Sequence, residues 1–322
     1  MRSGEVHSDE FKNILGLAVQ MGKLSSDQSV LKFFELINFD ELRDLNDLYC
    51  AVNGIGALKE KISSNDLLIA SAELNLHKEN DISLIPFGSL NYPLFLAITP
   101  NPPAILYIKG NVNILTDLPG VAIVGSRDVS PAGEEITRRI TSQIVNAGYV
   151  VVSGLAIGTD ANTHKATLQA KGKTIAVLAH GLEEAKPKQN SRLAQEILDK
   201  GGAWISEYPM GRPALKQSFV QRNRIQVGLS AASVLIEAAL NSGTMTQADF
   251  AIKAKRPVFA VVPHIIDNPL NLNCEGTLSL VKNNMAAPLR TKNDYDELIE
   301  VINKSRDNLL SLQHFGKQDK LI

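Results

Sequence analysis

Six short apolar segments constrain the fold of this chain more than any other feature of its sequence. Each runs for about four to six residues and ends at small or polar side chains, and stretches of helical length separate them. They start at Val121, Val150, Thr174, Trp204, Val234 and Val258. This pattern is typical of buried parallel strands joined by crossover helices. The sequence therefore predicts an α/β fold with a mostly parallel sheet, and a ligand site at the edge where the strands end.

Composition excludes several classes of protein. The chain has 322 residues, 44% hydrophobic and 21% charged, which is ordinary for a globular protein with two or three domains. It has no apolar run of about 18 residues and no apolar core of a secretory signal, so we expect a cytoplasmic protein without a membrane partner. Cys50 and Cys274 match no metal-ligand spacing, so we expect no metal site. Cys50 lies in an apolar stretch and is expected in the core.

The charge is distributed unevenly along the chain. Residues 1–90 hold 8 Lys and Arg against 14 Asp and Glu, whereas the remaining residues hold 25 against 20. The sheet-bearing part is therefore mildly basic, although the formal net charge of the chain is −1. An acidic region elsewhere can hide a positive groove from the overall balance.

Four segments are expected along the chain. Residues 1–80 are predicted to form a small all-helical domain. Its turn Val52–Ala57 is either a phosphate-contacting turn of the helix-hairpin-helix type or a plain helix connection. Residues 81–120 contain a proline-rich linker and a lead-in strand. Residues 121–290 hold the sheet, and residues 291–322 form a C-terminal helix and tail.

Two common nucleotide sites do not match. A dinucleotide site needs Gly-x-Gly-x-x-Gly after the first strand and an acid after the second. The turn from Gly125 to Gly133 has its glycines elsewhere, and the next strand ends at Ser153 and Gly154. A Gly-x-x-x-x-Gly-Lys loop is also absent from the sequence. We therefore expect neither a dinucleotide cofactor nor ATP hydrolysis.

Several turns at the predicted edge suit an anion. Arg127 follows the first strand, where its guanidinium can hold a phosphate or pair with Asp128 or Asp160. Ser153-Gly154 and Ser242-Gly243 are small turns that open helices, and Lys188 lies in the loop after the third strand. Asp160 or the residue before it is expected to cap a helix. His164 has no evident catalytic partner, so the pattern favours binding over catalysis.

A second group of residues suits a nucleic-acid strand. Phe219 precedes Arg222, Asn223 and Arg224, which combines an aromatic ring for stacking with charge for phosphates. The alternative is that Phe219 belongs to the core and that the arginines lie at a solvated helix end.

Taken together, these segments resemble the DNA-processing protein A family (DprA, also called Smf). The resemblance is carried by an ordered series over about 170 residues rather than by one motif. The series comprises Tyr92–Leu96, Asn101–Gly110, Val121–Arg127, Val152–Asp160, His164, Gly172–Leu178, Ser206–Pro209, Phe219–Ile225, Ser242–Thr246 and Arg256–Val261.

The resemblance implies an extended Rossmann-like fold, with helices on both faces of the sheet and a small all-helical domain before it. It implies a non-catalytic homodimer that binds and protects single-stranded DNA and loads a RecA-type recombinase during natural transformation. The DNA-binding residues that it implies are Gly125, Ser126, Arg127, Ser153, Gly154, Lys188, Phe219, Arg222, Asn223, Arg224, Ser242 and Gly243.

The chain departs from the family pattern late in the sheet. Pro263-His264 replaces the usual Pro-Gly turn, Asn268–Cys274 replaces a Gly-Asn segment, and Ala185-Lys186 replaces a Tyr-Pro step. The stretch after Ile302 is short for the winged helix that some members carry. These departures concern the dimer surface and recombinase docking most. A divergent relative that acts in phage defence or on a mobile element is an alternative.

Two further classes of protein are alternatives. Phosphoribohydrolases of related fold carry Pro-Gly-Gly-x-Gly-Thr-x-x-Glu, but Gln247 and Ala248 lie near the place of that Glu, which disfavours hydrolysis. A non-catalytic sensor of a small nucleotide would use the same turns. Phe219 and the spread of basic residues over several loops favour a longer ligand.

Overall fold

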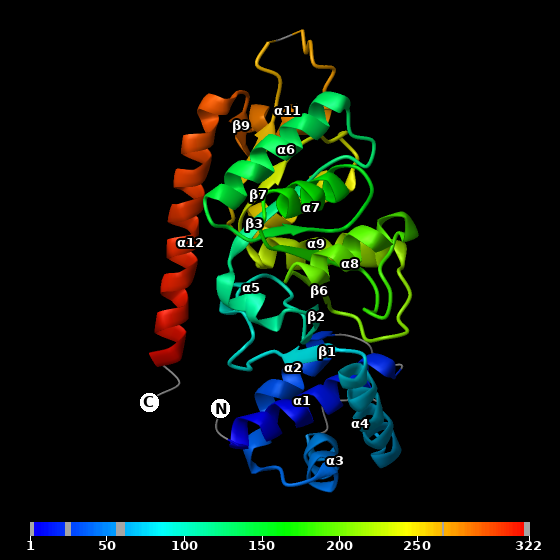
Figure 1. Ribbon diagram of the computed structural model, residues 1–322. Helices are drawn as coiled ribbons and strands as arrows, with labels where there is room; N and C mark the ends of the chain where they lie inside the picture. Colours follow the sequence, from blue (N-terminus) through cyan, green and yellow to red (C-terminus); the bar gives the residue numbers. More distant parts are fainter. Residues whose placement is uncertain (1–2, 23–26, 56–61, 266, 319–322) are drawn as a thin grey trace.

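The structure, a computed structural model, describes residues 3–22, 27–55, 62–265 and 267–318. Within these residues, nine strands form one sheet in the order β1-β2-β6-β5-β4-β3-β7-β8-β9 (Figure 1). The strands are β1 (Ile82–Pro86), β2 (Ile105–Gly110), β3 (Gly120–Val124), β4 (Val151–Ser153), β5 (Thr174–Val177), β6 (Ala203–Ser206), β7 (Ser230–Leu235), β8 (Val258–Val261) and β9 (Ala287–Leu289).

The six apolar segments of the sequence are the strands β3 to β8, which confirms the predicted mostly parallel sheet. All pairings from β6 through β9 are parallel, whereas β1–β2 and β2–β6 are antiparallel. The chain proceeds from β3 outward through β4, β5 and β6, and β7 then starts the other half on the opposite side of β3. The strand order therefore reverses between β3 and β7, where open α/β sheets bind ligands.

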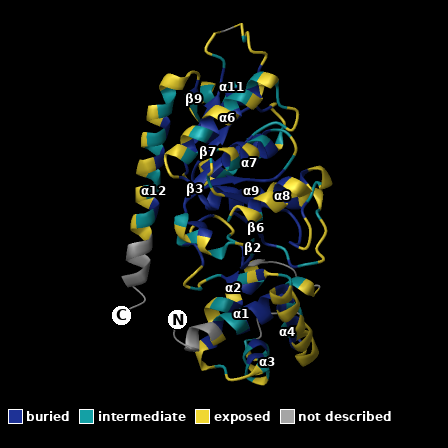
Figure 2. Ribbon diagram, viewed as in Figure 1, coloured by how far each residue is buried: buried dark blue, intermediate teal, exposed yellow. Residues whose placement is uncertain are grey.

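Helices cover both faces of this sheet. Ile105 and Tyr107 of β2 belong to one hydrophobic cluster, and the intervening Leu106 and Ile108 belong to another. Figure 2 shows the sheet as buried and the outer helix faces as exposed. The helices after β1 are α5 (Leu94–Ala97), α6 (Pro131–Asn146), α7 (Thr159–Gln169), α8 (Ser191–Asp199), α9 (Lys216–Gly228), α10 (Gly243–Lys253), α11 (Glu275–Lys282) and α12 (Tyr295–Gln318).

Residues before the sheet are helical, as expected: α1 (Ser3–Met21), α2 (Asp27–Leu36), a 3-10 turn η1 (Phe39–Glu41), α3 (Leu45–Gly54) and α4 (Ser64–Glu79). Their apolar faces belong to the same cluster as Tyr107 and Trp204 of the sheet. The domain boundary near residue 80 stays a prediction, and packing is continuous across it. Of the turn Val52–Ala57, residues 56 and 57 lie outside the described residues.

Two local expectations were wrong. Cys50 is exposed, because it lies between Leu48 and Val52, which form the buried face of α3. The N-cap of α7 is Gly158, not Thr159 or Asp160. Gly158 has a φ of +76°, and a Cβ there would come within 2.5 Å of the carbonyl oxygens of Ser126 and Arg127. Close approach of two loops therefore requires glycine at this cap.

The segment 81–120 contributes more than a lead-in strand, because both β1 and β2 join the sheet and extend it beyond β6. Between them lie the turn that holds α5 and the buried Tyr92, whose hydroxyl donates to the carbonyl of Pro103 at 2.7 Å. A 3-10 turn η2 (Val112–Asp117) leads into β3. Within the described parts of the chain, every helix is too short or too polar to span a bilayer.

Candidate nucleic-acid interface at the sheet edge

Three helices begin at the carboxyl ends of the central strands: α6 after β3, α7 after β4 and α10 after β7. A helix amino terminus attracts anions because its first N–H groups lack helical partners and its dipole is positive there. The three helix starts are therefore the first places to look for a phosphate site, and the structure distinguishes them clearly.

The amino terminus of α6 is already filled by a carboxylate of the chain. Glu237 lies two residues after the end of β7 and is fully buried. It accepts the N–H of Ser130 at 2.9 Å, the hydroxyl of Ser130 at 2.8 Å and the N–H of Asn273 at 2.9 Å. Ser130 in turn caps α6 by accepting the N–H of Gly133 at 3.0 Å. An external phosphate would meet the charge of Glu237 at this helix end.

The amino terminus of α7 is closed differently: the N–H of Thr159 donates to the carbonyl of Ser126 at 3.0 Å, and an acid lies close by. Asp160 lies in its first turn and accepts the N–H of Ala156 at 3.3 Å. Its carboxylate is 4.0 Å from the guanidinium of Arg222, and both side chains are buried. Burial raises the pKa of Asp160, while the nearby Arg222 opposes that rise. Asp160 therefore serves as the internal partner of Arg222.

The amino terminus of α10 is open. Its N-cap Ser242 makes no side-chain cap, and its buried hydroxyl has no partner among the described residues. Gly243 is exposed, and a Cβ built on it would meet nothing within 4 Å. The amide of Asn223 on α9 donates to the carbonyl of Gly243 at 3.3 Å. Of the three helix starts, α10 alone combines room with unneutralised N–H groups.

Arg127 and Phe219 lie against each other, and Phe219 is four residues before Asn223, which contacts the start of α10. The Arg127 guanidinium is 6.0 Å from the centre of the Phe219 ring, a cation–π contact, and both residues are exposed. Among the described residues Arg127 pairs with neither Asp128 nor Asp160. Arg127 also lowers the pKa of Arg222, although burial is the larger cause. The charge of Arg127 is therefore available to a ligand, whereas that of Arg222 is buried beside Asp160.

The arginines of α9 are buried rather than solvated. Arg222 bonds Gln226 and donates to the carbonyl of Gly154 at 3.3 Å. A Cβ at Gly154 would lie 1.7 Å from a guanidinium nitrogen of Arg222, so this position needs glycine. Arg224 faces elsewhere: it donates to both carboxylate oxygens of Glu207, one at 2.7 Å, and to the carbonyl of Asn101 at 2.7 Å. The structure thus separates the two arginines, and Arg224 holds α9 to the segment after β6.

Other residues singled out from the sequence support the backbone at this edge. A Cβ at Gly125 would come within 2.6 Å of the Thr159 hydroxyl, so Gly125 allows β3 and α7 to approach. The Ser153 hydroxyl is buried and donates to the carbonyl of Ile123 at 2.7 Å. The Ser126 hydroxyl donates to the carbonyl of Asp128 at 2.9 Å.

Lys188 lies at the start of a 3-10 turn η3 (Lys188–Asn190) and is exposed. The side chain of Asn190 donates to the carbonyl of Leu155 at 2.8 Å, which ties this turn to the loop after β4. Lys186 forms an ion pair with Glu184 at 3.0 Å. Lys188 is therefore placed beside the edge, with Glu184 nearby as a partial counter-charge.

Sequence reasoning missed two residues that matter here. Lys216 is exposed in the first turn of α9 and lies three residues before Phe219, so both share one helical face. That spacing was visible in the sequence. Glu237 carried no such signal, because a single acid at a strand end specifies no partner. His164 is buried and its Nδ1 lies 2.8 Å from the Thr174 hydroxyl; burial lowers its pKa to about 3, so it is neutral.

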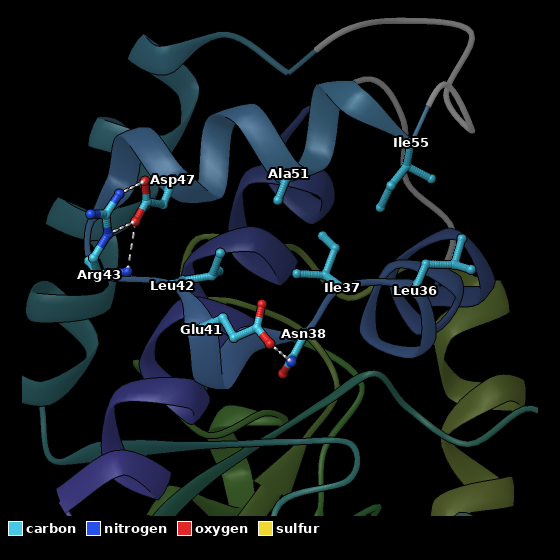
Figure 3. Close-up of a pocket in the computed structure, with 9 residues that line it drawn as sticks. All are labelled: Leu36, Ile37, Asn38, Glu41, Leu42, Arg43, Asp47, Ala51 and Ile55. Atoms are coloured by element: carbon cyan, nitrogen blue, oxygen red, sulfur yellow. Dashed lines mark hydrogen bonds and ion pairs between the residues drawn. The ribbon is translucent and has the colours of Figure 1, made fainter.

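A pocket of about 520 Å³ lies away from this edge, in the N-terminal helical region (Figure 3). Its rim carries the Arg43–Asp47 ion pair, at 2.8 Å, and the bond from Asn38 to Glu41, at 2.7 Å. Arg43 and Asp47 are therefore paired with each other, and Glu41 accepts a hydrogen bond from the neutral amide of Asn38.

Comparison with known proteins supports a family assignment. The family model for DNA recombination-mediator protein A matches residues 83–301, which include the whole parallel sheet. Protein Smf of Escherichia coli is 41% identical over 199 residues, which are 62% of this chain and 52% of that protein. The match thus spans about half the length of this curated relative.

Two solved structures share the fold. DNA processing protein A (DprA) of Streptococcus pneumoniae matches with a TM-score of 0.68 and 29% identity, over 91% of this chain and 96% of that chain. DNA processing protein A of Helicobacter pylori, described for its single-stranded DNA binding mode, matches with a TM-score of 0.60 and 29% identity, over 70% of this chain and 97% of that chain. Sequence and fold agree, and the chain belongs to the DNA recombination-mediator protein A family.

Proposed function

We propose that this chain binds single-stranded DNA along the carboxyl edge of its sheet, with backbone phosphates at the start of α10 and on Arg127 and a base stacked on Phe219. The observation that carries the proposal is the open amino terminus of α10 next to an exposed cation–aromatic pair. Phosphate capture together with an aromatic platform is the usual chemistry of strand binding without sequence preference.

Helix α9 brings these parts together. Phe219 and Asn223 are four residues apart and therefore share a face of α9. Phe219 contacts Arg127, and Asn223 bonds the first residue of α10. A strand that stacks a base on Phe219 would have its adjacent phosphate within reach of the α10 start. In this proposal Arg222, paired with Asp160, supports the loop after β4 from below the surface, and Arg224 takes no part.

Exposed lysines extend the interface. Lys216 lies one turn before Phe219, and Lys188 flanks the loop after β4. Charges spread over several loops suit a ligand longer than one nucleotide, because each successive phosphate needs its own cation. This distribution favours a strand over a small-nucleotide sensor.

We also propose that the role is binding rather than catalysis. Two buried acids at the edge, Asp160 and Glu237, are held by N–H groups and by Arg222, and neutral His164 is bound to Thr174. Gln247 stands near the place where phosphoribohydrolases carry their Glu, and an amide cannot act as the required acid or base.

Family membership and the strand-binding relative support a wider role. We propose that the protein acts in the cytoplasm in DNA processing for recombination, as a homodimer that protects a single strand and delivers it to a RecA-type recombinase. Natural transformation is the setting that the family resemblance favours.

The proposal is tested by fluorescence anisotropy of a labelled poly-dT strand of about 30 nucleotides, with unlabelled strand, duplex and dTMP as competitors. We expect tight binding that the unlabelled strand displaces and that duplex and dTMP displace weakly. Phe219→Ala is expected to weaken binding, and Phe250→Ala, on α10, is the aromatic control. Displacement by dTMP at concentrations near that of the strand would instead identify a small-nucleotide sensor.

A further inference from the structure

The loop from Glu207 to Leu215 joins β6 to α9 and therefore sets where α9 begins. Lys216 and Phe219, which carry the proposed DNA contacts, lie in the first turn of that helix. The loop is fixed by polar contacts from other parts of the chain. Gly211 donates its N–H to Glu183 at 3.2 Å, and the carbonyl of Arg212 accepts the N–H of Gly181 at 3.1 Å.

A third contact comes from the N-terminal helical region. The backbone N–H of Met210 donates to Nε2 of His77, on α4, at 2.9 Å. His77 is 1% exposed, and its ring lies 5.4 Å from that of Tyr107 on β2. This bond connects α4 directly to the loop that precedes α9.

The contact of the other ring nitrogen of His77 determines which nitrogen carries the proton in the neutral ring. Its Nδ1 lies 2.7 Å from the carbonyl oxygen of Glu73, which can only accept. The proton of the neutral ring therefore resides on Nδ1, and Nε2 keeps the lone pair that accepts the Met210 N–H. A second proton on Nε2 would face that N–H and abolish the contact.

We propose that His77 is a positioning residue for the DNA site: in its neutral form it holds the Met210 loop, and with it the start of α9, in the binding geometry. The proposal rests on the proposed function, because it is strand binding that the loop serves. It gives the N-terminal helical region a role in the affinity of an edge that it does not itself form.

The surroundings of His77 agree with a neutral ring. Burial lowers its pKa, whereas Glu73 on α4 and Glu183 after β5 oppose that shift. Tyr107 on β2 presents an uncharged ring, and its hydroxyl donates to Gln20 of α1 at 2.7 Å. Because the pKa of His77 lies below its ordinary value, protonation of the ring and release of the loop are expected only at acid pH, where strand affinity should fall.

The test compares wild type, His77→Gln and His77→Leu in strand binding over a pH series from 7.5 to 4.5, because the lowered pKa of His77 requires an acid end point. The amide oxygen of Gln can accept the Met210 N–H throughout the series. Leu cannot accept it at any pH, so His77→Leu is expected to bind the strand more weakly than wild type already at pH 7.5. We expect wild-type affinity to fall about threefold to tenfold on acidification, the range that one hydrogen bond is worth. His77→Gln is expected to change less than about twofold, and Lys78→Gln, an exposed neighbour on α4, to follow wild type.

Equal pH responses of wild type and His77→Gln would overturn the proposal. A second readout does not depend on DNA: hydrogen exchange of the 208–216 segment in the free protein, corrected for the intrinsic rate at each pH. We expect the exchange protection of this segment to fall on acidification in wild type and to persist in His77→Gln. Unchanged protection in wild type would contradict the proposed role of the His77–Met210 contact. Absence of strand binding at pH 7.5 would refute the proposed function. Hydrogen exchange alone would then test whether His77 holds the Met210 loop. If His77→Leu fails to fold, the comparison with His77→Gln decides the question.

Discussion

Replacing Arg222 by Met tests whether this residue acts as an internal support. Both Arg222 and Asp160 are buried, and their charges lie 4.0 Å apart. Arg222→Met removes the bonds to Gln226 and to the carbonyl of Gly154 and leaves Asp160 without its counter-charge. Breaking a buried pair from one side costs about 3–5 kcal/mol. We expect a loss of that size in the free energy of unfolding at pH 7, measured by urea denaturation.

The double variant Arg222→Met/Asp160→Asn distinguishes pairing from general packing. If the two groups support each other, the double variant loses less stability than the sum of the single variants, by about 1–3 kcal/mol. The pH dependence of the stability loss in Arg222→Met gives a further test. Burial raises the pKa of Asp160, and loss of Arg222 raises it further. The folded state then holds a proton that the unfolded chain releases above about pH 3.9, so the deficit of Arg222→Met shrinks as the pH falls toward that value.

A loss below about 1 kcal/mol for Arg222→Met would refute this reasoning, as would additivity of the two substitutions. Either result would mean that the Arg222 charge is not needed inside the fold. Arg222 would then return to the set of residues that contact DNA directly.

Three further outcomes are expected. Gly243→Asp places a carboxylate at the open start of α10 and should weaken strand binding at least tenfold in anisotropy, the scale of a charged hydrogen bond (about 1.5–3 kcal/mol). Gly243→Ala is the control, because a Cβ at this position meets no other atom, and it should bind within about twofold of wild type. Equal binding by the two variants would contradict a phosphate at this helix end. Phe219→Ala should cost about 1–3 kcal/mol of strand affinity, the worth of one stacked base, and an unchanged Kd would remove the ring from the interface. His164 is neutral in the folded protein, with a pKa of about 3, but titrates near 6.5 in the unfolded chain. The free energy of unfolding should therefore fall by up to about 1.4 kcal/mol per pH unit below 6.5. The urea midpoints of wild type and His164→Gln should diverge between pH 7 and 5, and a parallel pH dependence of the two midpoints would contradict this assignment.

The sequence predicted the sheet well because buried parallel strands leave a strong pattern. The strands β3 to β8 are continuous apolar runs, and small residues at their ends are visible without a structure. The additional strands were missed for physical reasons. β1 ends at Pro86 and precedes a proline-rich turn, and β9 has three residues, too few for a periodic signal.

The site was predicted less completely, because partners distant in sequence carry no local pattern. Arg127 and Phe219 were identified, but their contact depends on how α9 packs against the loop after β3. Arg224 and its partner Glu207 are 17 residues apart, so the buried pair could not be inferred from spacing. The same holds for Glu237, which closes the start of α6 from 107 residues away.

Phosphate capture at this edge, the central claim, is tested most directly by the salt dependence of poly-dT binding in wild type and Arg127→Ala. For single strands, log K falls with log[salt] by about 0.7 for each phosphate neutralised. We predict a clear negative slope for wild type, a slope shallower by about 0.7 for Arg127→Ala, and an affinity loss of about 1–3 kcal/mol. A flat salt titration of wild type, or identical slopes and affinities in the two proteins, would contradict the account.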